Sequence, residues 1–119
     1  MTYVTGFLQA VPEKNKEAYK TMAEMGWEIF KEFGCLSMQE NWGVDTPDGK
    51  LTSFPMAVKR EEGEVVVLSW LTWPDKATAD KGFDAMMNDP RMKDMPPMPF
   101  DGKRMMWGGF EPLVTLTAD

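Results

Sequence analysis

Histidine is absent from this sequence of 119 residues, and its absence removes several classes of chemistry. Neither Ser-His-Asp nor Cys-His catalysis can be assembled without it. The histidine ligands of non-haem iron, of many zinc sites and of haem are missing as well. We therefore expect no bound transition metal and no cofactor, and any acid–base chemistry would fall to Asp, Glu, Lys or Tyr.

Cysteine is almost as scarce, because Cys35 is the only one in the chain. No disulfide can form within the chain, and we expect a buried, inert thiol in a cytoplasmic protein. Long apolar runs are missing too: no stretch approaches the ~20 residues that a membrane-spanning helix needs. Residues 1–10 also lack the basic flank and apolar run of a signal peptide.

Basic side chains are outnumbered, with 13 Lys and Arg against 19 Asp and Glu and a net charge of -6. This balance argues against binding to nucleic acid or to an anionic membrane, since both require a basic surface. Hydrophobic residues make up 43% of the chain, which is enough for a core. The length suits a single domain spanning residues 1–119.

The residues that are present form alternating strand and helix patterns. Gly34 is expected to end the first helix and Asp75 to cap the start of the second. The order predicts an α+β, ferredoxin-like βαββαβ fold, an antiparallel sheet with two helices on one face. Strands are predicted at 3–11, 35–44, 65–73 and 103–116, helices at 15–33 and from Pro74 to Asp89, and an extended edge segment at 52–60.

The first predicted strand has two different faces. One face is small and apolar, which suits packing against helices, whereas the other carries rings and an amide and suits a lumen or an interface. The small face consists of Val4, Gly6, Leu8 and Ala10, and the mixed face of Tyr3, Thr5, Phe7 and Gln9.

Two helices can cover only one face of such a sheet. We expect the uncovered face to carry too many aromatic rings to leave in water. A second copy of the chain is the simplest cover, because symmetric dimers are the commonest oligomers. The sequence therefore predicts a homodimer. The rings concerned are Tyr3, Phe7, Trp42 and one of Trp70 and Trp73.

Several segments together resemble a known bacterial family, the domain of unknown function numbered 1428. They are PDGK (47–50), TSFPMAVK (52–59), VVVLSWLTWPDKATAD (65–80), DPRM (89–92) and MPFDGKRMMWGGF (98–110). The family is similar in fold to dimeric α/β-barrel proteins, which include cofactor-free monooxygenases acting on polyketides and quinols. The resemblance implies a dimeric α/β barrel and leaves the reaction open, because fold alone does not decide function.

Glu40 is the candidate catalytic residue, because strand alternation places it on one face with Met38 and Trp42. A carboxylate in an apolar lumen could act as a base. The alternative, which we consider about twice as common, is a structural ion pair with Arg104, Lys59 or Lys103 in the dimer.

The remaining candidates each have a plainer interpretation. Tyr3, Phe7, Gln9, Trp42 and Trp70 could line a ligand site, although such rings more often pack in cores and interfaces. Arg104, with Asp101 and Lys103 near it, could bind an anionic ligand or only fix a charged turn. The spacing of Met92, Met95 and Met98 could hold Cu(I), but filling space under a loop is far commoner.

Two functions follow as hypotheses. The first is a small apolar or aromatic molecule bound in the lumen of each subunit, with a cofactor-free monooxygenase-like reaction as one option. The second is a non-catalytic dimeric interaction or stress-accessory domain whose lumen is filled by its own side chains. A pocket of several hundred Å³ would favour the first, because ligand sites usually measure ~300–1,000 Å³.

Overall fold

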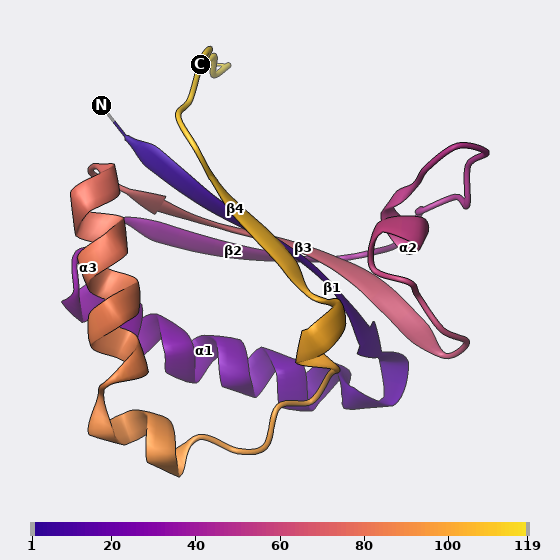
Figure 1. The fold of residues 1–119 in the computed structure, drawn as a ribbon, viewed down its shortest axis with the longest axis horizontal. Helices are drawn as coiled ribbons and strands as arrows, with labels where there is room; N and C mark the ends of the chain where they lie inside the picture. The colour runs from indigo at the N-terminus through magenta and orange to yellow at the C-terminus, as the bar shows by residue number, and fades with distance from the viewer. Residues whose placement is uncertain (1, 119) are drawn as a thin grey trace.

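The computed structural model describes residues 2–118 and shows a four-stranded antiparallel sheet in the order β2-β3-β1-β4 (Figure 1). Helices α1 and α3 lie together on one side of the sheet. The predicted α+β, ferredoxin-like plan is confirmed. The elements are β1 (Tyr3–Pro12), η1 (Glu13–Asn15), α1 (Lys16–Glu32), β2 (Ser37–Trp42), α2 (Phe54–Ala57), β3 (Glu64–Trp73), α3 (Lys76–Met87), η2 (Pro90–Asp94), η3 (Gly102–Arg104) and β4 (Met106–Phe110).

Local capping sets the ends of the two long helices. Asp75 accepts a hydrogen bond of 2.7 Å from the backbone N–H of Thr78 and starts α3, as predicted. Gly34 follows α1 with a φ of +100°, a conformation that glycine adopts without strain. Within residues 2–118, no helix combines the length and the hydrophobicity needed to cross a membrane.

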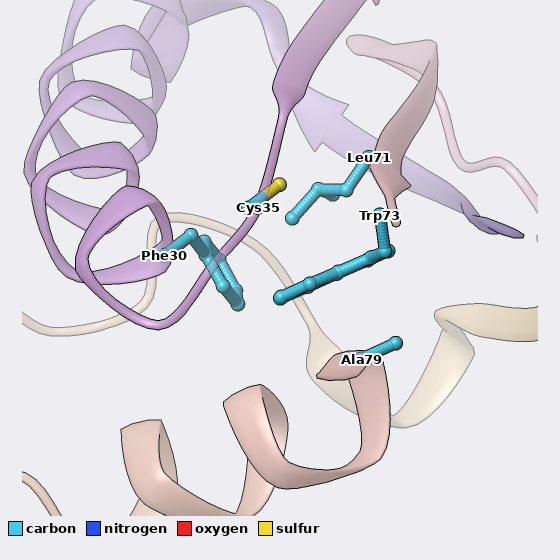
Figure 2. Packing of buried hydrophobic residues seen from close by; sticks show 5 residues of the cluster. All are labelled: Phe30, Cys35, Leu71, Trp73 and Ala79. Atoms are coloured by element: carbon cyan, nitrogen blue, oxygen red, sulfur yellow. The ribbon is translucent and has the colours of Figure 1, made fainter. Parts of the chain in front are cut away.

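Trp73 lies at the centre of the core between the sheet and the two long helices (Figure 2). Its ring centroid lies 5.9 Å from that of Phe30 of α1, edge-on, and 5.4 Å from that of Phe83 of α3. Its indole Nε1 donates a hydrogen bond of 3.1 Å to Thr5 Oγ1 of β1, which satisfies the only polar group of the ring. Trp73 therefore links both helices to two strands.

The predicted roles of the two faces of β1 were wrong. Gln9 donates a hydrogen bond to Tyr19 of α1 and Phe7 packs against Phe83 of α3, so the mixed face lies under the helices. Trp73 is on this covered face as well. A helix packed on a sheet leaves a gap that rings and long side chains fill at native density, whereas Gly and Ala would leave it hollow.

The small face of β1 lies on the opposite side of the sheet, where α2 covers part of it (Figure 1). Leu8 and Ala10 pack there against Val58, which follows α2. Gly6 leaves room for the ring of Phe110, whose Cε2 would lie 3.5 Å from a Cβ at that position. Small residues on this face thus allow two other segments to approach the strand closely.

Two predicted extended segments differ from the structure. Residues 54–57 form helix α2, because Ser53 caps its N-terminus through a hydrogen bond from Met56 N–H and Pro55 suits a first helical turn. The last strand ends at Phe110 rather than near residue 116. Phe110 pairs with Val4 at the very start of β1, so a longer β4 would have almost no partner strand left.

The glycines of the two long helices should respond in opposite ways to an added methyl group. A Cβ on Gly82 would lie 2.7 Å from Trp73 Cζ3, whereas a Cβ on Gly26 meets nothing closer than 3.9 Å. We expect Gly82→Ala to lower the free energy of unfolding by roughly 1–3 kcal/mol through overpacking. Gly26→Ala should raise it by roughly 0.5–1 kcal/mol through helix propensity. Urea denaturation of both variants measures the difference, and stabilisation by Gly82→Ala would contradict it.

Candidate functional site

Four polar side chains meet beneath α1 and form a closed ring of hydrogen bonds. Gln9 lies on β1, Glu40 on β2 and Ser69 on β3, and the register pairs Ser69 directly with Glu40. Tyr19 reaches this group from the first turn of α1. We call these four residues the polar ring. Only the assembled sheet and helix bring them together, because they are up to 60 residues apart in sequence.

The donors of the polar ring are all used within it. Tyr19 Oη and Ser69 Oγ each donate to Glu40 Oε1, over 2.6 and 2.5 Å respectively. Gln9 Nε2 donates to both hydroxyl oxygens, over 2.5 Å to Tyr19 and 3.0 Å to Ser69. Gln9 Oε1 is buried and accepts no hydrogen bond from any residue in 2–118. The ring therefore has an acceptor to spare and no donor.

Tyr19 keeps its proton at neutral pH. Burial raises the pKa of this phenol well above its ordinary value, and the negative charge of Glu40 and the hydrogen bond to it raise the pKa further. Tyr19 consequently remains a hydrogen-bond donor to Glu40. Within residues 2–118 Glu40 forms no ion pair, and Arg104, one of the cations considered for it, pairs with Glu64 and Asp101 instead.

A small apolar cavity, which we call the inner pocket, adjoins the polar ring. Its volume is about 210 Å³, and its only polar side chains are the four of the ring. Methionine sulfurs and aromatic rings dominate the rest of the wall. The methionines are Met22, Met38, Met86, Met92, Met95, Met98 and Met105, and the aromatic residues besides Tyr19 are Phe7, Phe30, Phe83 and Phe100.

A larger and more polar groove of about 860 Å³ lies on the other side of the Tyr19–Glu40 hydrogen bond, between α1 and β2. We call it the outer groove. Trp42 and Lys16 line it, with the Lys16 Nζ 5.3 Å from the centroid of the Trp42 ring. The two hollows share four residues, so Glu40 can contact a molecule in either one. The shared residues are Tyr19, Ala23, Met38 and Glu40.

Four of the site residues predicted from the sequence line the two hollows, and the other three do not. Phe7, Gln9 and Glu40 line the inner pocket, and Trp42 lines the outer groove. The others lie elsewhere. Tyr3 packs against the cluster around Trp73, Trp70 belongs to the opposite face of the sheet, and Arg104 lies in the 3-10 turn η3 before β4.

Arg104 joins three segments of the chain through its guanidinium group. It forms a bidentate ion pair with Glu64 at the start of β3, with N–O distances of 2.8 and 2.7 Å. It donates a hydrogen bond of 3.1 Å to Asp101 Oδ2. It also donates to the carbonyl of Lys59 over 2.8 Å. All its partners are protein acceptors, and the arrangement fits the fixed charged turn that the sequence offered as an alternative.

Cys35 is buried between α1 and β2, and burial raises the pKa of its thiol. Its Sγ donates to the carbonyl of Ser37 over 3.3 Å. A thiol that resists ionisation is a poor nucleophile, in agreement with the expected inert role.

Sequence reasoning missed Tyr19, Ser69 and most of the methionine wall. Tyr19 lies in the apolar stripe of its helix and Ser69 in a largely apolar strand, so neither residue type marked a site. A polar residue within an otherwise apolar strand, such as Ser69 in VVVLSWLTW, is the one signal that was available.

A family model described as "Protein of unknown function (DUF1428)" matches residues 2–102. The chain belongs to this family. Curated relatives are the "Uncharacterized protein YbaA" of Escherichia coli K12 and that of Shigella flexneri, each 53% identical over 96% of this chain and 98% of the relative. A solved structure described as a dimeric ferredoxin-like protein from an uncultured marine organism aligns with a TM-score of 0.51 and 13% identity, covering 99% of this chain and 100% of its own. That likeness shows the fold alone.

The Arg104 cluster predicts an acid-sensitive contribution to stability. The hydrogen bonds from Arg104 lower the pKa of Glu64, and the bond from Lys103 N–H together with Arg104 lowers that of Asp101. Carboxyl groups with a lowered folded-state pKa stabilise the fold above their ordinary pKa, and this stabilisation is lost as the pH falls through and below that value.

We expect Arg104→Ala to lower the free energy of unfolding by about 2–3 kcal/mol at pH 7. The difference from the unsubstituted protein should shrink between about pH 5 and pH 3, because the carboxyl groups become protonated. Denaturation at several pH values measures it, with Lys103→Ala as the control, because only its backbone N–H contacts Asp101. A pH-independent difference would contradict the proposed linkage.

Proposed function

We propose that this protein binds a small, mostly apolar molecule in the inner pocket. The observation that carries the proposal is the composition of the pocket wall: methionines and aromatic rings surround one polar group, the polar ring. Ligand sites typically combine an apolar wall with a few convergent polar atoms that fix orientation. A hollow built only for packing has no need of a buried Gln and Tyr and a half-buried Glu at its edge.

The methionine wall suits ligands of varied shape. Methionine has an unbranched, flexible side chain and a polarisable sulfur that contacts aromatic rings favourably. At about 210 Å³ the inner pocket is smaller than the ~300 Å³ at the lower end of usual ligand sites. The proposal is therefore a molecule of about one ring, or a longer one that passes Glu40 into the outer groove.

Catalysis is the more specific form of this proposal. Glu40 could take a proton from a bound substrate, as a cofactor-free monooxygenase-like reaction would require, and Tyr19 and Ser69 would hold the carboxylate in place through their hydrogen bonds. The competing function is a non-catalytic interaction domain with a self-filled lumen. The inner pocket supports binding over the self-filled alternative, since it remains hollow between the packed side chains.

We also propose that the protein is a homodimer that pairs through the open face of the sheet. Apolar side chains remain exposed there, although not the ones that the sequence suggested. Leu68 is 39% exposed, Met106 49% and Phe110 60%, and all three lie on the face opposite α1 and α3. A second copy would remove them from water, and a stable interface of this kind buries at least ~1,200 Å².

Sedimentation at micromolar concentration should give twice the 13.5 kDa of one chain. Leu68→Lys should yield monomers, because it places an unpaired charge in the apolar interface. Met25→Lys is the matched control: Met25 is 38% exposed and lies on α1, away from the open face, so this variant should remain dimeric. A monomeric unsubstituted protein would contradict the dimer.

Replacing Glu40 by Gln separates a ligand-binding role from a structural one. The Gln amide oxygen can still accept from Tyr19 and Ser69, and no buried cation is left unpaired, so we expect the free energy of unfolding to change by less than about 1 kcal/mol. Native mass spectrometry should find small molecules retained by the unsubstituted protein and fewer per folded subunit in Glu40→Gln. Glu62→Gln, in an exposed turn, is the control.

Two outcomes would contradict this proposal. A loss of about 3 kcal/mol or more in Glu40→Gln, with unchanged retention, would assign Glu40 to stability alone. No retained molecule, together with no binding of millimolar p-cresol or toluene to the emptied protein, would contradict small-molecule binding in the inner pocket.

A further inference from the structure

The polar ring fixes which kind of polar group a ligand must bring, and this inference rests on the proposed binding function. We propose that the inner pocket selects neutral ligands that donate a hydrogen bond, namely phenols, alcohols and N–H compounds. Ketones, ethers and carboxylates offer only acceptors and are selected against. The donor receives its partner in Gln9 Oε1, a buried acceptor that no residue of the described chain satisfies, once a flexible methionine of the wall moves aside and uncovers it.

The orientation of the Gln9 amide follows from the other three groups. A carboxylate can only accept, so the single protons of Tyr19 Oη and Ser69 Oγ are both committed to Glu40 Oε1. Each hydroxyl oxygen can then only accept from Gln9. The atom of Gln9 that faces both of them is therefore the NH₂ nitrogen, and the oxygen is the atom left over.

The same accounting leaves the inner pocket without a free donor. Both hydrogens of Gln9 Nε2, the Tyr19 hydroxyl and the Ser69 hydroxyl are used inside the polar ring. The remaining wall consists of methionine, phenylalanine, leucine, alanine and glycine, whose side chains donate no hydrogen bonds. A ligand carbonyl or carboxylate would lie against acceptors alone and lose its hydration without replacement.

Burial raises the free-energy cost of leaving Gln9 Oε1 without a hydrogen bond. Gln9 is 2% exposed, and leaving a buried acceptor unsatisfied is costly. A ligand that donates to Gln9 Oε1 removes this cost, whereas a ligand of the same shape without a donor preserves it. The apolar wall adds affinity for both ligands equally, so the donor decides the difference between them.

The test compares three probes that share one ring and differ in the polar group. These are p-cresol, which carries a donor, 4-methylanisole, whose ether oxygen only accepts, and p-toluate, an anionic acceptor. Affinities are measured by ligand-observed NMR and by the shift in melting temperature with the emptied protein. We expect p-cresol to bind about 10-fold or more tightly than 4-methylanisole, and p-toluate to bind weakest.

The variant Gln9→Met removes the acceptor and matches the length and character of the surrounding wall. Tyr19 and Ser69 keep their hydrogen bonds to Glu40 in this variant. We expect its p-cresol affinity to fall until it equals that for 4-methylanisole, whose own affinity stays unchanged. Gln39→Met, the same exchange on the exposed face of β2, should leave the preference intact. The ratio of two affinities is a readout that a purely structural role of Gln9 would not move.

Equal binding of p-cresol and 4-methylanisole to the unsubstituted protein would show that water already donates a hydrogen bond to Gln9 Oε1. This result would overturn the donor preference but would leave small-molecule binding intact. A preference that survives in Gln9→Met would overturn it as well, as would tightest binding of p-toluate. If Gln9→Met does not fold, the comparison of the three probes on the unsubstituted protein still tests the donor preference. Absence of binding by all three probes would overturn the donor preference and would count against the binding function itself.

Discussion

The packing of Trp73 between sheet and helices is the constraint on which the rest of this structure depends. Its ring is fully buried, touches α1 through Phe30 and α3 through Phe83, and hydrogen bonds to β1 through Thr5. Both helices must stand off the sheet by the thickness of this indole, and α3 can approach it only because residue 82 is glycine. The inner pocket adjoins this packing, since Phe30 and Phe83, which contact Trp73, also line the pocket.

The polar ring supplies hydrogen-bond partners to polar side chains that the helices cover. The covered face of the sheet is where a polar group costs most, yet Gln9, Glu40 and Ser69 all lie on it. The antiparallel register places Ser69 between the other two, and Tyr19 of α1 closes the ring from above. Each donor of the polar ring finds an acceptor within it, and Gln9 Oε1 is the buried atom of the ring that no residue in 2–118 satisfies.

The opposite face shows why small residues on a strand do not by themselves indicate helix packing. Gly6 and Ala10 lie beneath Phe110 and the α2 segment, which approach the strand more closely than a helix would. Leu68, Met106 and Phe110 on this face are left exposed. Exposed apolar surface of this kind typically marks an interaction site.

Sequence alone determined the elements whose signals are local. Gly34 and Asp75 mark helix ends through backbone conformation and capping, and the mostly apolar run of β3 identifies a central strand of the sheet. The residue types of the site were visible as well, since alternation placed Glu40 among apolar neighbours. The absence of histidine limited its chemistry before any fold was known.

Tertiary structure alone decided which face of the sheet the helices cover and which residues Glu40 contacts. Strand alternation gives two sets of residues but not the side on which a helix will dock, because that depends on filling the gap at native density. Tyr19 and Ser69 became partners of Glu40 through the sheet register and the placement of α1, neither of which is encoded near residue 40. Hydrogen-bond partners across such sequence separations are fixed only when the chain has folded.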